Sequence, residues 1–139
     1  MRFYLLVAFI LLEFSLAQET QTLELQLLVT VDPEILFNHV NPMLFTLSSP
    51  YGDFEVEATG ELYKDDPELY WENLHPIVWK LEFPKTLKSL ETSITARLAL
   101  CDKQQGLCYF EDIDLKENLS LKQSQNKQTL YFTLDRLAY

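Results

Sequence analysis

Glycine, cysteine and histidine are scarce in this 139-residue chain, with three, two and two copies respectively. The spacing of the few cysteines and histidines does not fit a zinc site. The chain also lacks a glycine-rich phosphate loop, a dinucleotide-binding fingerprint and a nucleophile-elbow motif. The sequence therefore predicts neither a metal site nor a bound cofactor.

Basic residues are also in short supply. The chain has 11 Lys and Arg against 21 Asp and Glu, which gives a formal net charge of −10. The basic residues are scattered, so they do not form the patch that is typical of nucleic-acid binding. The negative charge also disfavours contact with an anionic membrane surface. We therefore expect no nucleic-acid partner and no membrane association of the mature chain, which we expect to be a monomer.

The only long apolar run lies at the N-terminus. Arg2 precedes an unbroken apolar stretch at residues 3–12, and Ser15-Leu16-Ala17 has the small-x-small pattern of a signal-peptide cleavage site. The stretch is shorter than the roughly 20 residues that a membrane-spanning helix needs. We predict a signal peptide at residues 1–17 and a single periplasmic or secreted domain at residues 18–139. The alternative is a short membrane anchor or a buried first strand.

Apolar and polar residues alternate with a period of two through most of the remaining chain. This alternation indicates β-strands that bury one face, whereas a helical period is hard to find. Turn-forming pairs such as Asp32-Pro33, Asn41-Pro42 and Asp66-Pro67 separate the runs. About seven strands are predicted, at residues 23–31, 43–48, 53–58, 77–83, 94–100, 107–115 and 130–135.

Strands with one apolar and one polar face suit two antiparallel sheets that pack face to face. About seven strands in a chain of this length match the size of an immunoglobulin-like domain. The predicted fold class is therefore all-β, an immunoglobulin-like antiparallel β-sandwich of about seven strands. A small β-barrel would produce a similar pattern and is the alternative.

The two cysteines are close in sequence and enclose a polar loop. Cys101 ends one predicted strand and Cys108 begins the next, so the two should face each other across a hairpin. In an exported protein such a pair is expected to form a disulfide. The alternation places both cysteines on the more polar side of their strands, near solvent. The disulfide could simply pin the hairpin, or it could be accessible and exchange with other thiols.

The cysteine segment resembles a known family. In residues 94–109 a strand ends in Cys101, a loop with the late Gly106 follows, and the next strand opens with Cys108-Tyr109. This arrangement resembles the N-terminal periplasmic domain of the thiol:disulfide interchange protein DsbD family. Further resemblance lies in His39-Val40-Asn41-Pro42 and in Tyr70-Trp71 with Pro76-Ile77-Val78. The chain departs from the family in having Phe110-Glu111 where prolines often follow Cys-Tyr.

The resemblance implies an immunoglobulin-like fold and a Cys101–Cys108 pair that cycles between dithiol and disulfide. It implies a stand-alone protein-disulfide reductase or exchange component. Reducing equivalents would pass through the pair to or from thioredoxin-like or other exported thiol proteins. The residues implied to cap the pair are Glu61, Leu62 and Tyr63, and Tyr109 is implied to assist it. The alternative is a non-enzymatic immunoglobulin-like interaction domain with a structural disulfide.

Overall fold

A computed structural model of the chain describes residues 19–122 and 126–135, so the predicted signal peptide lies outside the described residues. All regular structure within these ranges is β-strand. In the described part of the chain there is no helix long and apolar enough to cross a membrane. The ten strands are β1 (Thr20–Val31), β2 (Ile35–Asn38), β3 (Leu44–Ser49), β4 (Gly52–Glu57), β5 (Gly60–Leu62), β6 (Tyr70–Leu74), β7 (Ile77–Pro84), β8 (Ser89–Asp102), β9 (Cys108–Ser120) and β10 (Lys127–Leu134).

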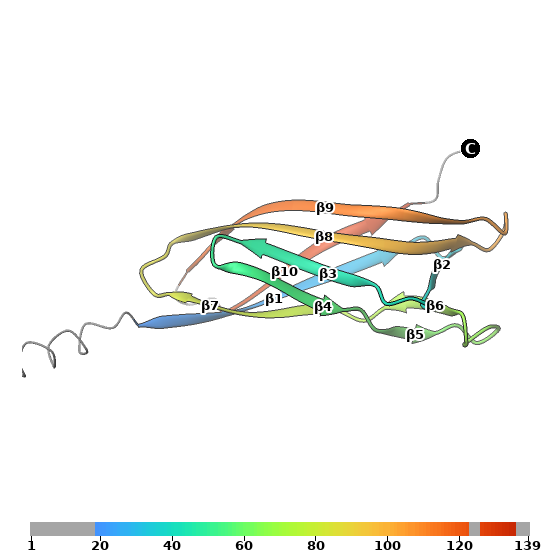
Figure 1. Cartoon of the computed structure of the whole chain (residues 1–139), viewed down its shortest axis with the longest axis horizontal. Helices are drawn as coiled ribbons and strands as arrows, with labels where there is room; N and C mark the ends of the chain where they lie inside the picture. Colours follow the sequence, from blue (N-terminus) through green and yellow to red (C-terminus); the bar gives the residue numbers. More distant parts are fainter. Residues whose placement is uncertain (1–18, 123–125, 136–139) are drawn as a thin grey trace, which may run out of the picture.

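The strands form two sheets in a sandwich-like arrangement (Figure 1). In the smaller sheet, β1 lies between β7 and β10. The larger sheet is built around β8, which pairs with β9 along one edge. Along its other edge β8 pairs first with β3 and then with β2. β4 extends the sheet beyond β3, and β6 and β5 extend it beyond β2.

The apolar faces of both sheets make one core. Burying alternate side chains on each strand brings them out of water, which is the main stabilising contribution in such a sandwich. The Trp79 indole N–H on β7 also donates a hydrogen bond to the Phe54 carbonyl on β4 at 3.1 Å, which joins the two sheets. The largest fully buried side chains are Phe37, Phe45, Leu23, Leu25, Leu27, Ile35, Leu47, Ile77, Ile94, Leu98, Leu100 and Ile113.

The all-β sandwich prediction is confirmed, with two differences in detail. The seven predicted runs correspond to β1, β3, β4, β7, β8, β9 and β10. β2, β5 and β6 were not predicted, because strands of 3–5 residues are too short for alternation to be recognised. The second difference is that β10 runs parallel to β1, whereas all other paired strands are antiparallel as predicted.

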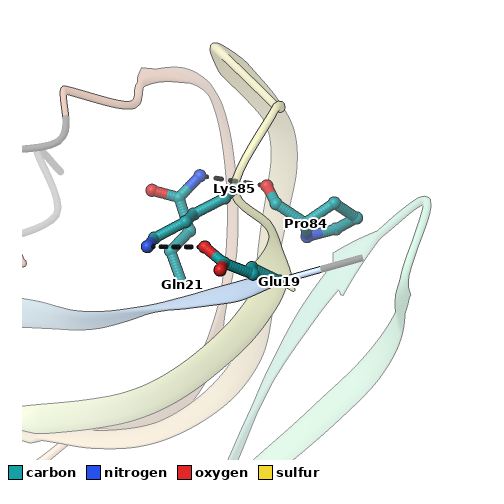
Figure 2. Close-up of polar contacts among 4 residues, drawn as sticks. All are labelled: Glu19, Gln21, Pro84 and Lys85. Atoms are coloured by element: carbon teal, nitrogen blue, oxygen red, sulfur yellow. Dashed lines mark hydrogen bonds and ion pairs between the residues drawn. The ribbon is translucent and has the colours of Figure 1, made fainter. Parts of the chain in front are cut away.

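The start of β1 is held against the end of β7 by polar contacts (Figure 2). The Lys85 ammonium lies 3.0 Å from the Glu19 carboxylate, and the Gln21 side-chain amide donates to the Pro84 carbonyl at 3.0 Å. The Lys85 backbone N–H donates to the Glu19 carbonyl as well. Cleavage after the predicted signal peptide at residues 1–17 would leave all of these contacts in the mature chain.

Candidate functional site

The predicted hairpin disulfide is present between neighbouring strands of the larger sheet. Cys101 of β8 pairs in register with Cys108 of β9, with a Cα–Cα distance of 4.0 Å and a sulfur–sulfur distance of 2.05 Å. The backbone N–H of Asp102 donates to the Leu107 carbonyl at 2.8 Å. The cysteines therefore occupy the adjacent non-hydrogen-bonded position, where opposed side chains approach most closely.

The two cysteines differ in exposure, which the alternation pattern did not predict. Cys108 is exposed, whereas Cys101 is only 5% exposed. The expectation that both lie near solvent is therefore wrong for Cys101. Along the edge that faces away from β9, β8 pairs with β2, which places Leu36 opposite Cys101. Since β2 was not predicted, nothing in the sequence pattern indicated this covering neighbour.

The segment between β5 and β6 also approaches the disulfide. Tyr63 and Tyr70 line the same cavity as Cys101 and Cys108. In Figure 1 the β5–β6 hairpin and the turn between β8 and β9 lie at the same end of the molecule. Of the three residues implied to form a cap, Tyr63 is thus brought to the cysteine pair.

The other two predicted cap residues lie on β5 and do not line this cavity. Leu62 is 57% exposed, and Glu61 is exposed with its carboxylate 3.5 Å from the Asn73 side-chain amide. Tyr109 directly follows Cys108 and is half-buried against the core. It also contributes to a groove on the other side of the disulfide. Of the four residues, Tyr63 and Tyr109 therefore lie next to the disulfide, whereas Glu61 and Leu62 do not.

Tyr63 is held by contacts with its own hairpin and with the loop between the cysteines. Its ring lies 5.0 Å from the Lys103 ammonium, its hydroxyl donates to Asp65 at 3.2 Å, and its backbone N–H donates to the Tyr70 carbonyl. The pKa of Tyr63 is raised by partial desolvation, by that hydrogen bond and by the negative charges of Asp65, Glu72 and Glu34. The phenol is therefore neutral at physiological pH.

The hairpin that carries Tyr63 is closely packed around Gly60 and Trp71. A Cβ atom on Gly60 would come within 2.5 Å of the Asn73 carbonyl and 2.6 Å of the Trp71 ring. The His39 ring stacks on Trp71 with 4.8 Å between centroids, and its Nε2 lies 3.0 Å from the Pro67 carbonyl. The segment at His39 is therefore in contact with β6 and with the loop that precedes it.

The groove on the opposite side of the disulfide is partly apolar. It is lined by Val40, Pro42 and Phe110 together with both cysteines. Phe110 is 64% exposed, and the Arg97 guanidinium lies 4.7 Å from the centre of its ring. Cys108 is thus bordered by the exposed apolar side chains of Val40 and Phe110.

Two residues of the loop between the cysteines were not singled out as site residues from the sequence. Asp102 is buried and accepts hydrogen bonds from the loop, and Lys103 connects the loop to its surroundings. The Lys103 ammonium donates to the Pro33 carbonyl at 2.8 Å in addition to its contact with Tyr63. An Asp at the start of a tight loop is a signal for such side-chain capping, and it could have identified Asp102.

Residues 19–122 and 126–135 contain no group of His, Cys, Asp and Glu side chains that could hold a metal ion. The chain matches no protein-family model and none of the curated proteins with which it was compared.

Proposed function

We propose that this protein is an exported thiol–disulfide interchange domain of the DsbD N-terminal type. In this role the Cys101–Cys108 pair relays reducing equivalents to or from thioredoxin-like partners in the periplasm or outside the cell. The observation that carries the proposal is the disulfide at the neck of the β8–β9 hairpin, with one exposed and one buried cysteine. Accessible disulfides are those that exchange with other thiols.

The exposure difference gives the two sulfur atoms different roles. A partner thiolate attacks Sγ of Cys108, the bond between Cys108 and Cys101 breaks, and Cys101 leaves as a thiolate that then takes up a proton. A second thiolate of the partner then attacks the partner sulfur that is bonded to Cys108, and Cys108 is released as a thiolate. The domain is thereby reduced to a dithiol and the partner is oxidised to a disulfide.

The reverse direction passes these electrons on. The Cys108 thiolate attacks a disulfide in a second exported protein and forms a mixed disulfide with it. The Cys101 thiolate then attacks Sγ of Cys108, which restores the intramolecular disulfide and releases the second protein as a dithiol. No cofactor is needed, because both electrons move with the exchanging sulfur atoms.

The surroundings suit a relay. Tyr63 lines the cavity next to the pair, where its ring can restrict the approach of unselective oxidants and small thiols. Val40 and Phe110 border the other side and offer an apolar surface to a protein partner. A partner that binds this surface can bring its thiolate to Cys108 while the buried Cys101 stays within the domain.

The reduction potential of the Cys101–Cys108 pair tests this proposal. The mature domain is equilibrated with glutathione or dithiothreitol buffers, and the fraction of reduced cysteine is measured. We expect a potential of about −180 to −270 mV, the range of proteins that exchange disulfides. A potential below about −300 mV would mark a structural disulfide and favour a non-enzymatic interaction domain.

A further inference from the structure

Asp102 is the only charged residue buried in the described part of the chain. It is 2% exposed and follows Cys101 directly in β8. Burying a carboxylate is costly unless hydrogen bonds compensate the loss of water. A buried carboxylate next to a disulfide therefore needs a structural reason, and its contacts with the loop supply one.

The loop between the cysteines is organised by hydrogen bonds that converge on Asp102. Its carboxylate Oδ1 accepts from the backbone N–H groups of Gln104 at 2.9 Å and Gln105 at 3.1 Å. Its carbonyl accepts from the Gly106 N–H at 2.9 Å, and its own N–H donates to the Leu107 carbonyl at 2.8 Å. Gly106 has a φ of 67°, the left-handed conformation that glycine adopts without strain.

None of these hydrogen bonds involves a sulfur atom. They can therefore persist when the disulfide is reduced, and the loop can keep its shape without the covalent link. A loop that is already ordered in the dithiol form keeps the two thiols close together, so their effective concentration is high. A disordered loop would instead lose conformational entropy each time the disulfide re-forms.

We propose that Asp102 is a positioning residue that sets the dithiol–disulfide equilibrium of Cys101 and Cys108 by keeping their loop closed in the reduced protein. The inference rests on the proposed function, because only a pair that cycles has a working reduced state. It also assigns Asp102 a role in resolution. When Cys108 is bound to a partner, the closed loop keeps the Cys101 thiolate within reach of the mixed disulfide.

The test compares variants by their equilibrium with dithiothreitol. In this reaction the reagent's two thiols become a cyclic disulfide, while the Cys101–Cys108 bond breaks and each cysteine sulfur gains a hydrogen. Asp102→Ala removes the acceptor for two loop N–H groups, so the loop should be less ordered in the reduced protein. We expect its disulfide to be about tenfold easier to reduce, a shift of about 30 mV.

Two variants separate hydrogen bonding from charge. Asp102→Asn keeps a side-chain oxygen at the Oδ1 position and loses the charge, so we expect it to stay within about threefold of wild type. Asp114→Ala removes one exposed carboxylate from β9 of the same hairpin, and we expect no change. If Asp102→Ala does not fold, Asp102→Ser replaces it, since a hydroxyl can cap one loop N–H and should give an intermediate shift.

Equal equilibria for wild type and for the Ala or Ser variant would overturn the role of Asp102. So would a shift in Asp102→Asn as large as that in Asp102→Ala, because it would assign the effect to charge. The wild-type potential is read in the same experiment and tests the proposed function separately. A wild-type reduction potential in the range of structural disulfides would reject the relay function. If Asp102→Ala were still easier to reduce than wild type, the role of Asp102 in closing the loop would stand.

Discussion

The ammonium of Lys103 lies 5.0 Å from the centre of the Tyr63 ring. This cation–π contact joins the loop between the two cysteines to the segment that follows β5. Both residues also line the cavity that contains Cys101 and Cys108. The contact therefore joins two parts of the cavity wall that come from segments far apart in sequence.

Replacing Tyr63 with Ala should expose the disulfide. An exposed cation–π contact contributes about 0.5–1 kcal/mol, so losing it should raise the rate of reduction by dithiothreitol about two- to fivefold. The rate is measured under pseudo-first-order conditions by the appearance of free thiol. Tyr63→Phe keeps the ring over Lys103 and should react like wild type. Equal rates for wild type and Tyr63→Ala would show that the ring does not limit access.

The ionisation of Tyr63 should occur above pH 10. Partial desolvation and the hydrogen bond to Asp65 raise the pKa of this phenol above its ordinary value of 10.0. The neutral phenol is favoured in the folded state, so its contribution to stability is present below about pH 10 and is lost as pH rises through the folded-state pKa. The difference between the phenolate absorbance titrations of wild type and Tyr63→Phe gives this pKa.

Asp65→Asn provides the matched variant for that titration. It removes a negative charge near Tyr63 and weakens the acceptor of its hydroxyl. The pKa of Tyr63 should therefore fall towards its ordinary value. An unchanged titration in Asp65→Asn would contradict the assignment of Asp65 as a cause of the shift.

Single cysteine variants should differ in reactivity. In Cys101→Ala the remaining Cys108 is exposed, whereas in Cys108→Ala the remaining Cys101 is almost fully buried. Since exchange requires access to the sulfur, Cys101→Ala should react with an aromatic disulfide reagent on the order of tenfold faster. It should also trap most of the mixed disulfide with a thioredoxin-like protein. Equal reactivity of the two variants would remove the structural basis for assigning attack to Cys108.

Gly60→Ala should destabilise the hairpin that carries Tyr63. Its methyl group would come within 2.6 Å of both the Asn73 carbonyl and the Trp71 ring, contacts that require backbone or ring displacement. Such overpacking costs about 1–3 kcal/mol, measurable by urea unfolding. Gly106→Asn is the control, because no atom lies within 4 Å of its Cβ position and Asn tolerates a φ of 67°. A loss in Gly106→Asn equal to that in Gly60→Ala would contradict steric crowding as the cause.

The strands that the sequence predicted are the long ones. β1 buries Leu23, Leu25 and Leu27 on one face, and β8 buries Ile94 and Leu98 in the same way. The period of two can therefore be recognised in the sequence of these strands. Burial on one face of a strand is a local property of alternating residues, and it requires no knowledge of the partner strand. β2, β5 and β6 have too few residues to carry the same signal.

The sequence by itself determined an all-β chain, a polar hairpin loop and a cysteine at each end of that loop, because spacing along two adjacent strands sets which residues face each other. Only the tertiary structure decided that Cys101 is buried and Cys108 exposed, since β2 and the segment after β5 cover one side of the pair. It also brought Tyr63 to Lys103. Contacts between segments far apart in the chain depend on sheet order, which alternation does not encode.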